Sequence, residues 1–475
     1  MNWANRQIRS FLACLVSATA VLYATTAWAA VTIPADATSG MSCANSVCTP
    51  TAANPALNVT DLENQLASGN VEVTTMLISA SVNMSDLGSE KVLHSFQSGS
   101  DGASPYYGAL IADGASNAYG TTSSGGSGGC SDGGCGTVYK LTKDRKERVL
   151  YSFRGGSDGA GPLGALTRDA SGTLYGTTVG GGGTGCGGFG CGTVFEVARD
   201  GRETVLYTFQ SEDDGFQPVS NVIKDKSGNL YGTTGAGGDY SSSCSSEGCG
   251  TVFELQSNGT KIALYKFQGG TDGQGPTGPL IMDFAGDLYG TTQGGGGCAL
   301  GGCGTVFELT PAGDETILYA FQGGDDGLGP LGGVVMSSGN DLYGTTFSGG
   351  AHNCCGVVFK VPAGGGSETT VYSFRGGSDG ANPLAGVIFD KKGNLYGTTE
   401  YGGSKGCGGR GCGTVFKLAP DGTESVLYAF KGRHQNPHGA NPAASLLLGK
   451  KGTLYGTTTV GGTANDGVVF SLKTK

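Results

Sequence analysis

The chain has 475 residues, of which 92 are glycine and only 14% are charged, and its formal net charge is −10 at pH 7. An acidic chain lacks the basic surface that nucleic acids and anionic membranes require, so we expect neither as a partner. The glycines recur at fixed offsets beside Leu, Val, Tyr and Phe, so we interpret them as turns between short strands and not as a disordered region.

Residues 1–30 have the features of a secretory signal peptide. Arg6 and Arg9 form a basic start, residues 11–23 are apolar, and Ala-Trp-Ala at 27–29 precedes the expected cleavage site. Polar residues interrupt this region, so a membrane anchor is the weaker interpretation, and no later stretch is apolar enough to span a bilayer. We therefore expect a secreted or periplasmic protein, with a net charge of −12 after cleavage and fourteen cysteines in an oxidising compartment.

Residues 31–87 precede the repeats and are interpreted as a small N-terminal add-on or linker. Cys43 and Cys48 are close enough in sequence to form a disulfide. A capping box predicts a short helix from Asp61, and residues 71–82 predict a strand.

The rest of the chain is a tandem repeat. Each copy carries four short apolar runs bounded by Gly, Asp or Asn, and Asp-Gly or Asn-Gly pairs predict tight hairpin turns. In the sixth copy the predicted strands are 383–389, 394–399, 414–418 and 426–430. Each repeat is therefore predicted to be a four-stranded antiparallel meander. The motif Tyr-Gly-Thr-Thr marks the copies and begins at Tyr119, Tyr175, Tyr231, Tyr289, Tyr343, Tyr396 and Tyr455.

The strands are apolar on both faces, so each meander must be covered on both sides. Seven meanders stacked in a closed ring meet this requirement and predict an all-β, seven-bladed β-propeller over residues 88–475. Residues 92–96 match the fourth strand of other copies, whereas the last copy ends with its third strand at 467–472. We expect the N-terminal strand to complete the last blade and close the ring.

The sixth copy reads Asn-Leu-Tyr-Gly-Thr-Thr, a glycine-rich loop, Cys-Gly-Thr-Val-Phe-Lys-Leu, an Asp-Gly turn and Val-Leu-Tyr-Ala-Phe. This pattern resembles the GloVer (Gloeobacter/Verrucomicrobia) tandem repeat of exported bacterial proteins, of the choice-of-anchor type. The resemblance covers about residues 90–475 and implies an extracytoplasmic repeat protein without an assigned biochemical role. Anchored members carry a C-terminal sorting anchor; this chain departs from them, because it ends at Lys475 just after the last predicted strand.

The loops between the second and third strands carry paired cysteines with four residues between them. Zinc sites more often use tighter spacing with a second pair or histidines nearby, so these pairs are interpreted as local disulfides. Each closes a short loop and stabilises it by about 2 kcal/mol. The fifth copy has adjacent Cys354 and Cys355 instead, as a vicinal disulfide or as two free thiols, and the seventh copy has no cysteine. The pairs are Cys130 and Cys135, Cys186 and Cys191, Cys244 and Cys249, Cys298 and Cys303, and Cys407 and Cys412.

The blade-to-blade loops share the same rim and place an aspartate at one equivalent position. An Asp-Gly turn explains the aspartate structurally, and a ring of carboxylates that attracts Ca²⁺ or a cationic ligand is the alternative. Repetition favours the turn, because a structural turn must recur whereas a metal site need occur only once. The residues are Asp101, Asp158, Asp214, Asp272, Asp326 and Asp379.

Three of the four histidines are predicted on this rim. His438 stands where the seventh aspartate would be, at the end of a longer basic loop that contains His434, and His352 lies in the loop of the fifth copy. A metal or catalytic cluster is one interpretation, although exposed loop histidines are common. His94 lies in a predicted strand and is expected to be structural.

The chain has no nucleophile elbow, P-loop, dinucleotide fingerprint or zinc-protease motif. We expect a monomeric, non-catalytic scaffold that binds an extracellular ligand, glycan or protein through the loop rim, with Ca²⁺ as the one cofactor left open. The alternatives are an extracytoplasmic hydrolase or lactonase-like enzyme with a metal or histidine site on that rim, and a structural cell-surface or matrix component. An enzyme needs unlike groups converging on one point, which nearly equivalent copies do not provide.

Overall fold

The structure, a computed structural model, describes residues 41–44, 47–50, 90–130, 133–210, 212–244, 246–298, 302–432 and 438–474. The chain divides into two units, residues 1–87 and 88–475. In the first unit, β1 (Met41–Ala44) pairs antiparallel with β2 (Val47–Pro50), with Cys43 opposite Cys48. Only the backbone of these strands is described. The predicted Cys43–Cys48 disulfide, the signal peptide, the helix from Asp61 and the strand at 71–82 lie outside the described residues.

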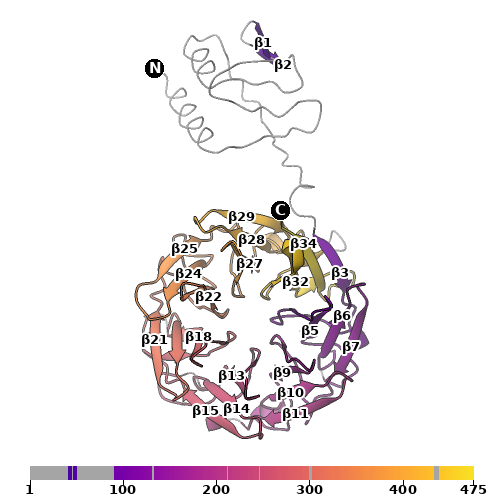
Figure 1. Ribbon diagram of the computed structural model, residues 1–475, viewed down its shortest axis with the longest axis vertical. Helices are drawn as coiled ribbons and strands as arrows, with labels where there is room; N and C mark the ends of the chain where they lie inside the picture. Colours follow the sequence, from indigo (N-terminus) through magenta and orange to yellow (C-terminus); the bar gives the residue numbers. More distant parts are fainter. Residues whose placement is uncertain are drawn as a thin grey trace. The chain divides into compact units, whose positions relative to one another are not determined.

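The second unit is the predicted seven-bladed β-propeller, with seven four-stranded antiparallel sheets arranged in a ring (Figure 1). Strands are given below from the axis outward. Blade 1 contains β4 (Ile111–Ala112), β5 (Ala118–Thr122), β6 (Thr137–Leu141) and β7 (Glu147–Ser152). Blade 2 contains β8 (Thr167–Arg168), β9 (Leu174–Thr178), β10 (Thr193–Val197) and β11 (Glu203–Thr208), and blade 3 contains β12 (Ile223–Lys224), β13 (Leu230–Thr234), β14 (Thr251–Leu255) and β15 (Lys261–Lys266). Blade 4 contains β17 (Ile281–Met282), β18 (Leu288–Thr292), β20 (Thr305–Leu309) and β21 (Glu315–Ala320).

Blade 5 contains β22 (Val335–Met336), β23 (Asp341–Thr345), β24 (Val357–Pro362) and β25 (Thr369–Ser373). Blade 6 contains β26 (Ile388–Phe389), β27 (Leu395–Thr399), β28 (Thr414–Leu418) and β29 (Glu424–Ala429). Blade 7 contains β31 (Leu447–Leu448), β32 (Thr453–Thr458), β34 (Val468–Lys473) and β3 (Lys91–Ser95). Two short ladders join loops, β16 (Gly273–Gln274) with β19 (Gly294–Gly295) and β30 (Gly439–Ala440) with β33 (Val460–Gly461). The described residues contain no α-helix, only the 3₁₀ turns η1 (Gly99–Asp101), η2 (Cys186–Gly188), η3 (Glu212–Asp214), η4 (Cys407–Gly409) and η5 (Lys450–Gly452).

The ring closes as the sequence predicts. β3, the first strand of the propeller, pairs antiparallel with β34, the last, with Lys91 opposite Ser471 and Ser95 opposite Val468. The closing strand thus supplies the outer strand of blade 7. The two ends of the propeller are joined in one sheet, and no blade lacks its outer strand.

The innermost strands are much shorter than predicted. The prediction placed a strand over 383–389, but β26 pairs over only its last two residues. The preceding segments of neighbouring blades converge on the axis and pack backbone against backbone. A methyl group added at Gly332, for example, would overlap the backbone of Ala385 and Gly386 in the next blade. This crowding replaces sheet pairing and explains the small residues there.

One pair of aromatic rings fills each of the seven seams between neighbouring blades. The phenylalanine that follows the outer strand of one blade packs edge-to-face on the third-strand aromatic residue of the next, with ring centroids 4.9–5.3 Å apart. This geometry is the favourable one for aromatic pairs. The pairs are Phe96–Tyr139, Phe153–Phe195, Phe209–Phe253, Phe267–Phe307, Phe321–Phe359, Phe374–Phe416 and Phe430–Phe470.

These contacts give the Tyr-Gly-Thr-Thr motif a structural role. In blade 2, Tyr175 donates a hydrogen bond to Asp169 in the tight turn. A Cβ at Gly176 would lie 2.6 Å from the Phe195 ring, so only glycine fits. Thr177 bonds the Ser220 carbonyl of blade 3, and Thr178 bonds Thr193 within its own blade. The motif therefore fixes the second strand to its turn, its blade and its neighbour.

Candidate functional site

The aspartates predicted on the blade-to-blade loops lie between the outer strands of neighbouring blades. The carboxylate of Asp158 accepts a 2.6 Å hydrogen bond from Tyr151 Oη and a 2.7 Å bond from the backbone N–H of Arg154. At Asp101 a histidine, His94, takes the place of the tyrosine. The predicted turn role accounts for these contacts, and the ligand role of this ring stays a prediction. The same tyrosine and N–H contacts recur at Asp214, Asp272, Asp326 and Asp379.

A glutamate from the next blade faces five of these aspartates. Glu203, the first residue of β11, is half-buried opposite Asp158, and burial together with the Asp158 charge raises its pKa to about 7. At the sixth aspartate a lysine takes the glutamate's place, and Lys261 Nζ lies 2.9 Å from Asp214 Oδ1. Five of these seams therefore pair an aspartate with a glutamate of raised pKa, and the sixth pairs an aspartate with a lysine. Burial, with an adjacent aspartate, likewise raises the pKa of Glu147, Glu315, Glu368 and Glu424 to about 7.

The histidines predicted on the rim have different surroundings. His438 replaces the aspartate at the seam between blades 6 and 7, with its Nδ1 2.5 Å from Glu90 Oε2 and 3.2 Å from Tyr428 Oη. His352 is exposed, and His434 lies outside the described residues. Neither His352 nor His438 belongs to a group of three side chains, within the described part of the chain, that could share a metal ion. The histidine cluster stays a prediction.

The five predicted cysteine pairs of the loop rim form disulfides, as do the adjacent Cys354 and Cys355. Four of these loops share one backbone hydrogen bond, and those of blades 2 and 6 also share a 3₁₀ turn, η2 and η4. In four blades a glycine N–H donates, at 2.7–3.1 Å, to the carbonyl of the residue two places before the second cysteine. The bonds join Gly125 to Gly133, Gly181 to Phe189, Gly237 to Glu247, and Gly402 to Arg410.

These fixed loops display different side chains at equivalent positions. Phe189 is 80% exposed and Arg410 is exposed, although both stand on the same backbone bond. The glycine that follows Phe189 cannot vary, because a Cβ at Gly190 would overlap the backbone of Gly181. The loops of blades 2 and 6 therefore both keep this glycine, at Gly190 and Gly411, and differ at other positions, among them Thr184 and Lys405 as well as Phe189 and Arg410.

A second variable position follows each Tyr-Gly-Thr-Thr motif. A groove of about 630 Å³ between blades 6 and 7 has Glu400 from this position in its wall, together with Arg410 and Tyr401, and Asn441 and Thr459. The Arg410 guanidinium lies 5.9 Å from the centre of the Tyr401 ring. Sequence analysis missed this position, which comparing the seven copies residue by residue would have revealed. The residues there are Ser123, Val179, Gly235, Gln293, Phe347, Glu400 and Thr459.

Burial raises the pKa of two ionisable groups of this groove, Glu400 and Tyr401. For the Glu400 carboxyl, the Tyr401 hydrogen bond and the Arg410 charge oppose that shift in pKa. The Glu400 charge also contributes, after burial and Tyr106, to raising the pKa of Tyr107, which lines the central channel. Glu400 therefore lies close to both the groove and the channel.

The central channel has a volume of about 300 Å³, and its described lining includes no carboxylate and no histidine. Blade 1 differs from the others here, because it carries the extra residue of the pair Tyr106 and Tyr107 after Pro105. Thr457, which faces this blade, has a buried hydroxyl with no hydrogen-bond partner among the described residues, whereas Thr121 bonds the Gly164 carbonyl. The repeated hydrogen bond to the next blade is thus not made by Thr457, nor by Thr233, which bonds Ser220 instead.

The model of the Gloeobacter/Verrucomicrobia repeat matches residues 81–242, 131–302 and 297–475. The chain belongs to this repeat family. The match spans all seven blades, so the family's repeat corresponds to the propeller blades described above. No helix in the described part of the chain is long and apolar enough to cross a membrane.

No curated protein matches this member of the repeat family. Among solved structures, a proposed gluconolactonase is 11% identical with a TM-score of 0.39, covering 82% of this chain and 92% of its own. The extracellular domain of a proposed one-component system from B. thetaiotaomicron is 9% identical with a TM-score of 0.47, covering 79% of this chain and 39% of its own. A luciferin-regenerating enzyme is 11% identical with a TM-score of 0.38, covering 78% and 92%. Likenesses at this level carry no argument about activity.

Proposed function

We propose that this repeat protein is exported and acts as a non-catalytic binding scaffold, with the loop rim as its binding surface. The observation that carries the proposal is that the disulfide loops of blades 2 and 6 keep the same backbone hydrogen bond and 3₁₀ turn, while the exposed side chain on them changes from Phe189 to Arg410. Binding residues are typically placed on loops held by a rigid frame. Export is supported by the disulfides, which form and persist in oxidising compartments, and by the signal-like residues 1–30. Surface anchoring of the choice-of-anchor type stays a prediction.

The groove between blades 6 and 7 is the part of the rim that best fits a polar extracellular ligand, a glycan or a segment of a protein. It combines one aromatic ring, at Tyr401, with the charged groups of Glu400 and Arg410 and the amide of Asn441. Ligand sites typically pair apolar surface with a few convergent polar groups that set orientation.

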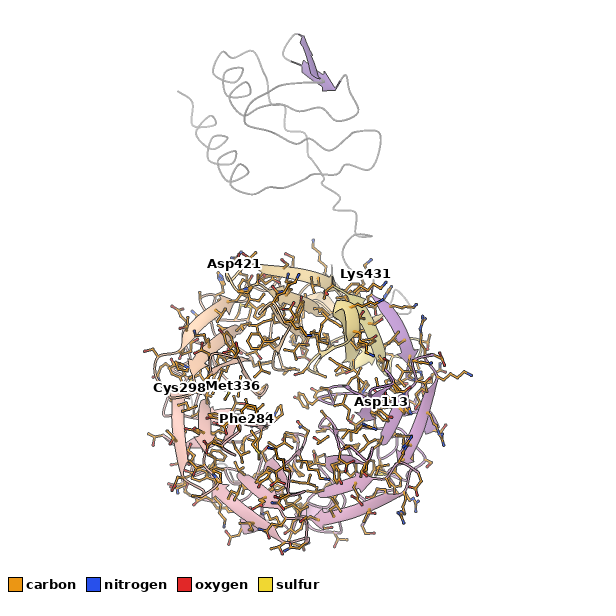
Figure 2. All side chains as sticks on the ribbon, viewed as in Figure 1. Asp113, Phe284, Cys298, Met336, Asp421 and Lys431 are labelled. Atoms are coloured by element: carbon orange, nitrogen blue, oxygen red, sulfur yellow. A yellow bond between two sulfur atoms is a disulfide. The ribbon has the colours of Figure 1, made fainter. Side chains whose placement is uncertain are left out.

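The test is a binding screen of the oxidised, full-length protein on glycan and peptide arrays, followed by affinity measurements on matched variants. We expect Arg410→Ala and Phe189→Ala to weaken binding about tenfold or more when the ligand contacts their loops. The control is Phe284→Ala. Phe284, labelled in Figure 2, is fully exposed on the turn between β17 and β18, and so lies at the other end of β18 from the loop that carries Cys298. Equal losses in Phe284→Ala and the rim variants, or no binding by the parent protein, would contradict the proposal.

An extracytoplasmic hydrolase is the second candidate, and Glu400 is the observation that favours it. A half-buried carboxyl with a raised pKa, close to Tyr107 and Arg410, is the type of group that serves as a general acid or base. Glu400→Gln keeps the shape and removes the acid. Hydrolysis of a bound glycan or lactone that Glu400→Gln abolishes, without loss of binding, would establish the enzyme in place of the scaffold.

A further inference from the structure

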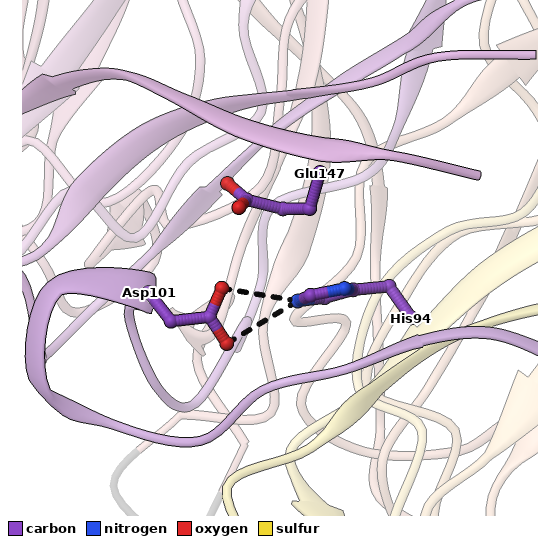
Figure 3. Close-up of side chains that lie close together, drawn as sticks. All are labelled: His94, Asp101 and Glu147. Atoms are coloured by element: carbon purple, nitrogen blue, oxygen red, sulfur yellow. Dashed lines mark hydrogen bonds and ion pairs between the residues drawn. The ribbon is translucent and has the colours of Figure 1, made fainter. Parts of the chain in front are cut away.

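The seam that closes the ring contains a group of side chains unlike those of the other seams. His94 lies on the closing strand β3, Asp101 lies in the loop that follows, and Glu147 begins β7 of blade 1. Figure 3 shows the three side chains converging. One potential ligand atom from each residue lies within 4.8 Å of the other two. Three chain segments therefore contribute one side chain each to a single point.

This seam differs from the neighbouring seams in the residue that contacts the aspartate. Where this seam has His94, five of the others have a tyrosine that donates a hydrogen bond to the aspartate. A neutral phenol provides a hydrogen-bond donor, whereas an imidazole nitrogen is a common metal ligand. Within the described residues, the His94 group is the one place where three metal-binding side chains come together. The repeat thus provides the two carboxylates at several seams, and only this seam adds the imidazole.

The separations suit a small tetrahedral ion. His94 Nε2 lies 3.2 Å and 3.3 Å from the two carboxylate oxygens of Asp101. A Zn²⁺ ion about 2.0–2.1 Å from each donor would hold its donors roughly 3.3 Å apart, so this pair is already at the spacing of two zinc ligands. Glu147 Oε1 is buried and has no hydrogen-bond partner among the described residues, as is also the case for Oε1 of Glu203, Glu315 and Glu424, so the feature specific to this seam is the His94 imidazole. A cation would bind that oxygen and offset the repulsion between the two carboxylates.

We propose that His94, Asp101 and Glu147 form a Zn²⁺ site that fastens the closing strand to blade 1. One nitrogen and two carboxylate ligands suit zinc better than Ca²⁺, which prefers an all-oxygen shell. The side chains of His94 and Asp101 are 18% and 21% exposed, so an ion reaches them from solvent and a water completes the coordination. Because His94 lies in blade 7 and Glu147 in blade 1, bound zinc holds these two blades together at their seam and stabilises the folded ring.

The experiment is titration of the chelator-treated, oxidised full-length protein with Zn²⁺ alone, followed by calorimetry and by thermal unfolding. We expect saturable binding below about 100 µM Zn²⁺ and an unfolding midpoint raised by several degrees at saturation. His94→Tyr is the matched loss variant, because it rebuilds the arrangement of the other seams and should fold. It should bind one zinc ion fewer than the parent and lose the stabilisation. Glu147→Gln should have the same effect and serves if His94→Tyr is poorly folded.

Tyr265→His is the matched gain variant. Its seam already has Asp272 and Glu315, and the N–H of Gln268 bonds Asp272 as that of Gln97 bonds Asp101. This variant should bind one zinc ion more than the parent. The proposal would be overturned by an unchanged zinc stoichiometry in His94→Tyr, by no zinc binding in the parent, or by Ca²⁺ binding at this seam in preference to Zn²⁺. The difference between variants separates this seam from zinc bound by His352, His434 or His438.

Discussion

At the seams between blades the same contacts are made seven times, whereas on the loop rim the same backbone carries different side chains. Each seam buries one edge-to-face aromatic pair, such as Phe321 with Phe359. On the rim, Phe189 and Arg410 occupy one equivalent position with opposite chemistry. A contact that must recur in every blade is structural, and a side chain that changes while its backbone stays is free to serve a ligand. This contrast supports the proposal that the rim is the binding surface.

The largest effect is expected from removing the closing strand. Deleting residues 88–97 removes β3 and Phe96, leaves β34 as an unpaired edge and exposes the Tyr139 side of blade 1. We expect the single cooperative unfolding transition to disappear, because the seams stabilise one another only in a closed ring. Calorimetry or circular dichroism on heating measures this. An unchanged unfolding midpoint would show that the ring does not depend on its closure.

A matched pair of substitutions compares the seam directly with the rim. Phe321→Ala removes a fully buried ring and should lower the free energy of unfolding by about 3–5 kcal/mol. Phe189→Ala makes the same chemical change at an 80% exposed position and should change that free energy by less than about 0.5 kcal/mol. Urea unfolding of both variants measures the difference. Similar losses in the two variants would remove the distinction between seam and rim.

We expect each disulfide to stabilise mainly the loop that it closes. Replacing both Cys186 and Cys191 with alanine opens the loop that carries Phe189 and should cost about 2 kcal/mol, because each bond closes a very short loop. The paired measurements are urea unfolding and the rate of hydrogen exchange in residues 181–192. If exchange stays slow throughout that loop, its conformation does not rest on the disulfide. Thiol counting on the unreduced parent should find few reactive groups, because twelve cysteines of the described residues are bonded.

The smallest effect is a pH dependence that arises at the seams. Burial and neighbouring aspartates raise the pKa of Glu203, Glu315, Glu368 and Glu424 to about 7, against an ordinary value of 4.5. A carboxyl whose pKa is higher in the folded state than in the unfolded state stabilises the fold at a pH below its unfolded-state pKa. This stabilisation is lost as the pH rises through the folded-state pKa of about 7. The unfolding midpoint should therefore fall by a few degrees between about pH 5 and pH 8, since the half-exposed glutamates are partly screened.

Glu203→Gln is the control for that pH dependence. The amide still has a donor for Asp158 but does not titrate, so the fall in the unfolding midpoint with pH should become shallower. If the unfolding midpoint of Glu203→Gln falls with pH as steeply as that of the parent protein, the pH dependence arises from other groups.

The repeat made most of the fold predictable. Seven copies, apolar on both faces, required a ring, and the missing fourth strand of the last copy identified 92–96 as the closing strand. The inner strands were overestimated, because apolar runs do not reveal that backbones such as those of Gly332 and Gly386 crowd at the axis. The five loop disulfides followed from spacing and compartment alone, whereas for Cys354 and Cys355 the sequence left a disulfide and two free thiols open.

The site was less predictable, because its determinants are differences between copies. Asp158 was predicted as a turn residue, but its partner Glu203 lies in the next blade, 45 residues away along the chain. His94 was predicted to be a structural residue of a strand, and nothing in the sequence indicated that its side chain contacts Asp101 in the loop that follows. Glu400 directly follows the Tyr-Gly-Thr-Thr motif, which is the same in every copy, so the variable position after the motif was not recognised as a candidate site.

The central claim is that the identity of the rim side chains, and not the frame, determines what this protein binds. The direct test is the affinity of the double exchange Phe189→Arg with Arg410→Phe for a ligand found on the arrays. The exchange keeps composition, net charge and both loop backbones. The account predicts an unchanged unfolding midpoint and an affinity lowered about tenfold or more. An affinity equal to that of the parent protein would contradict it.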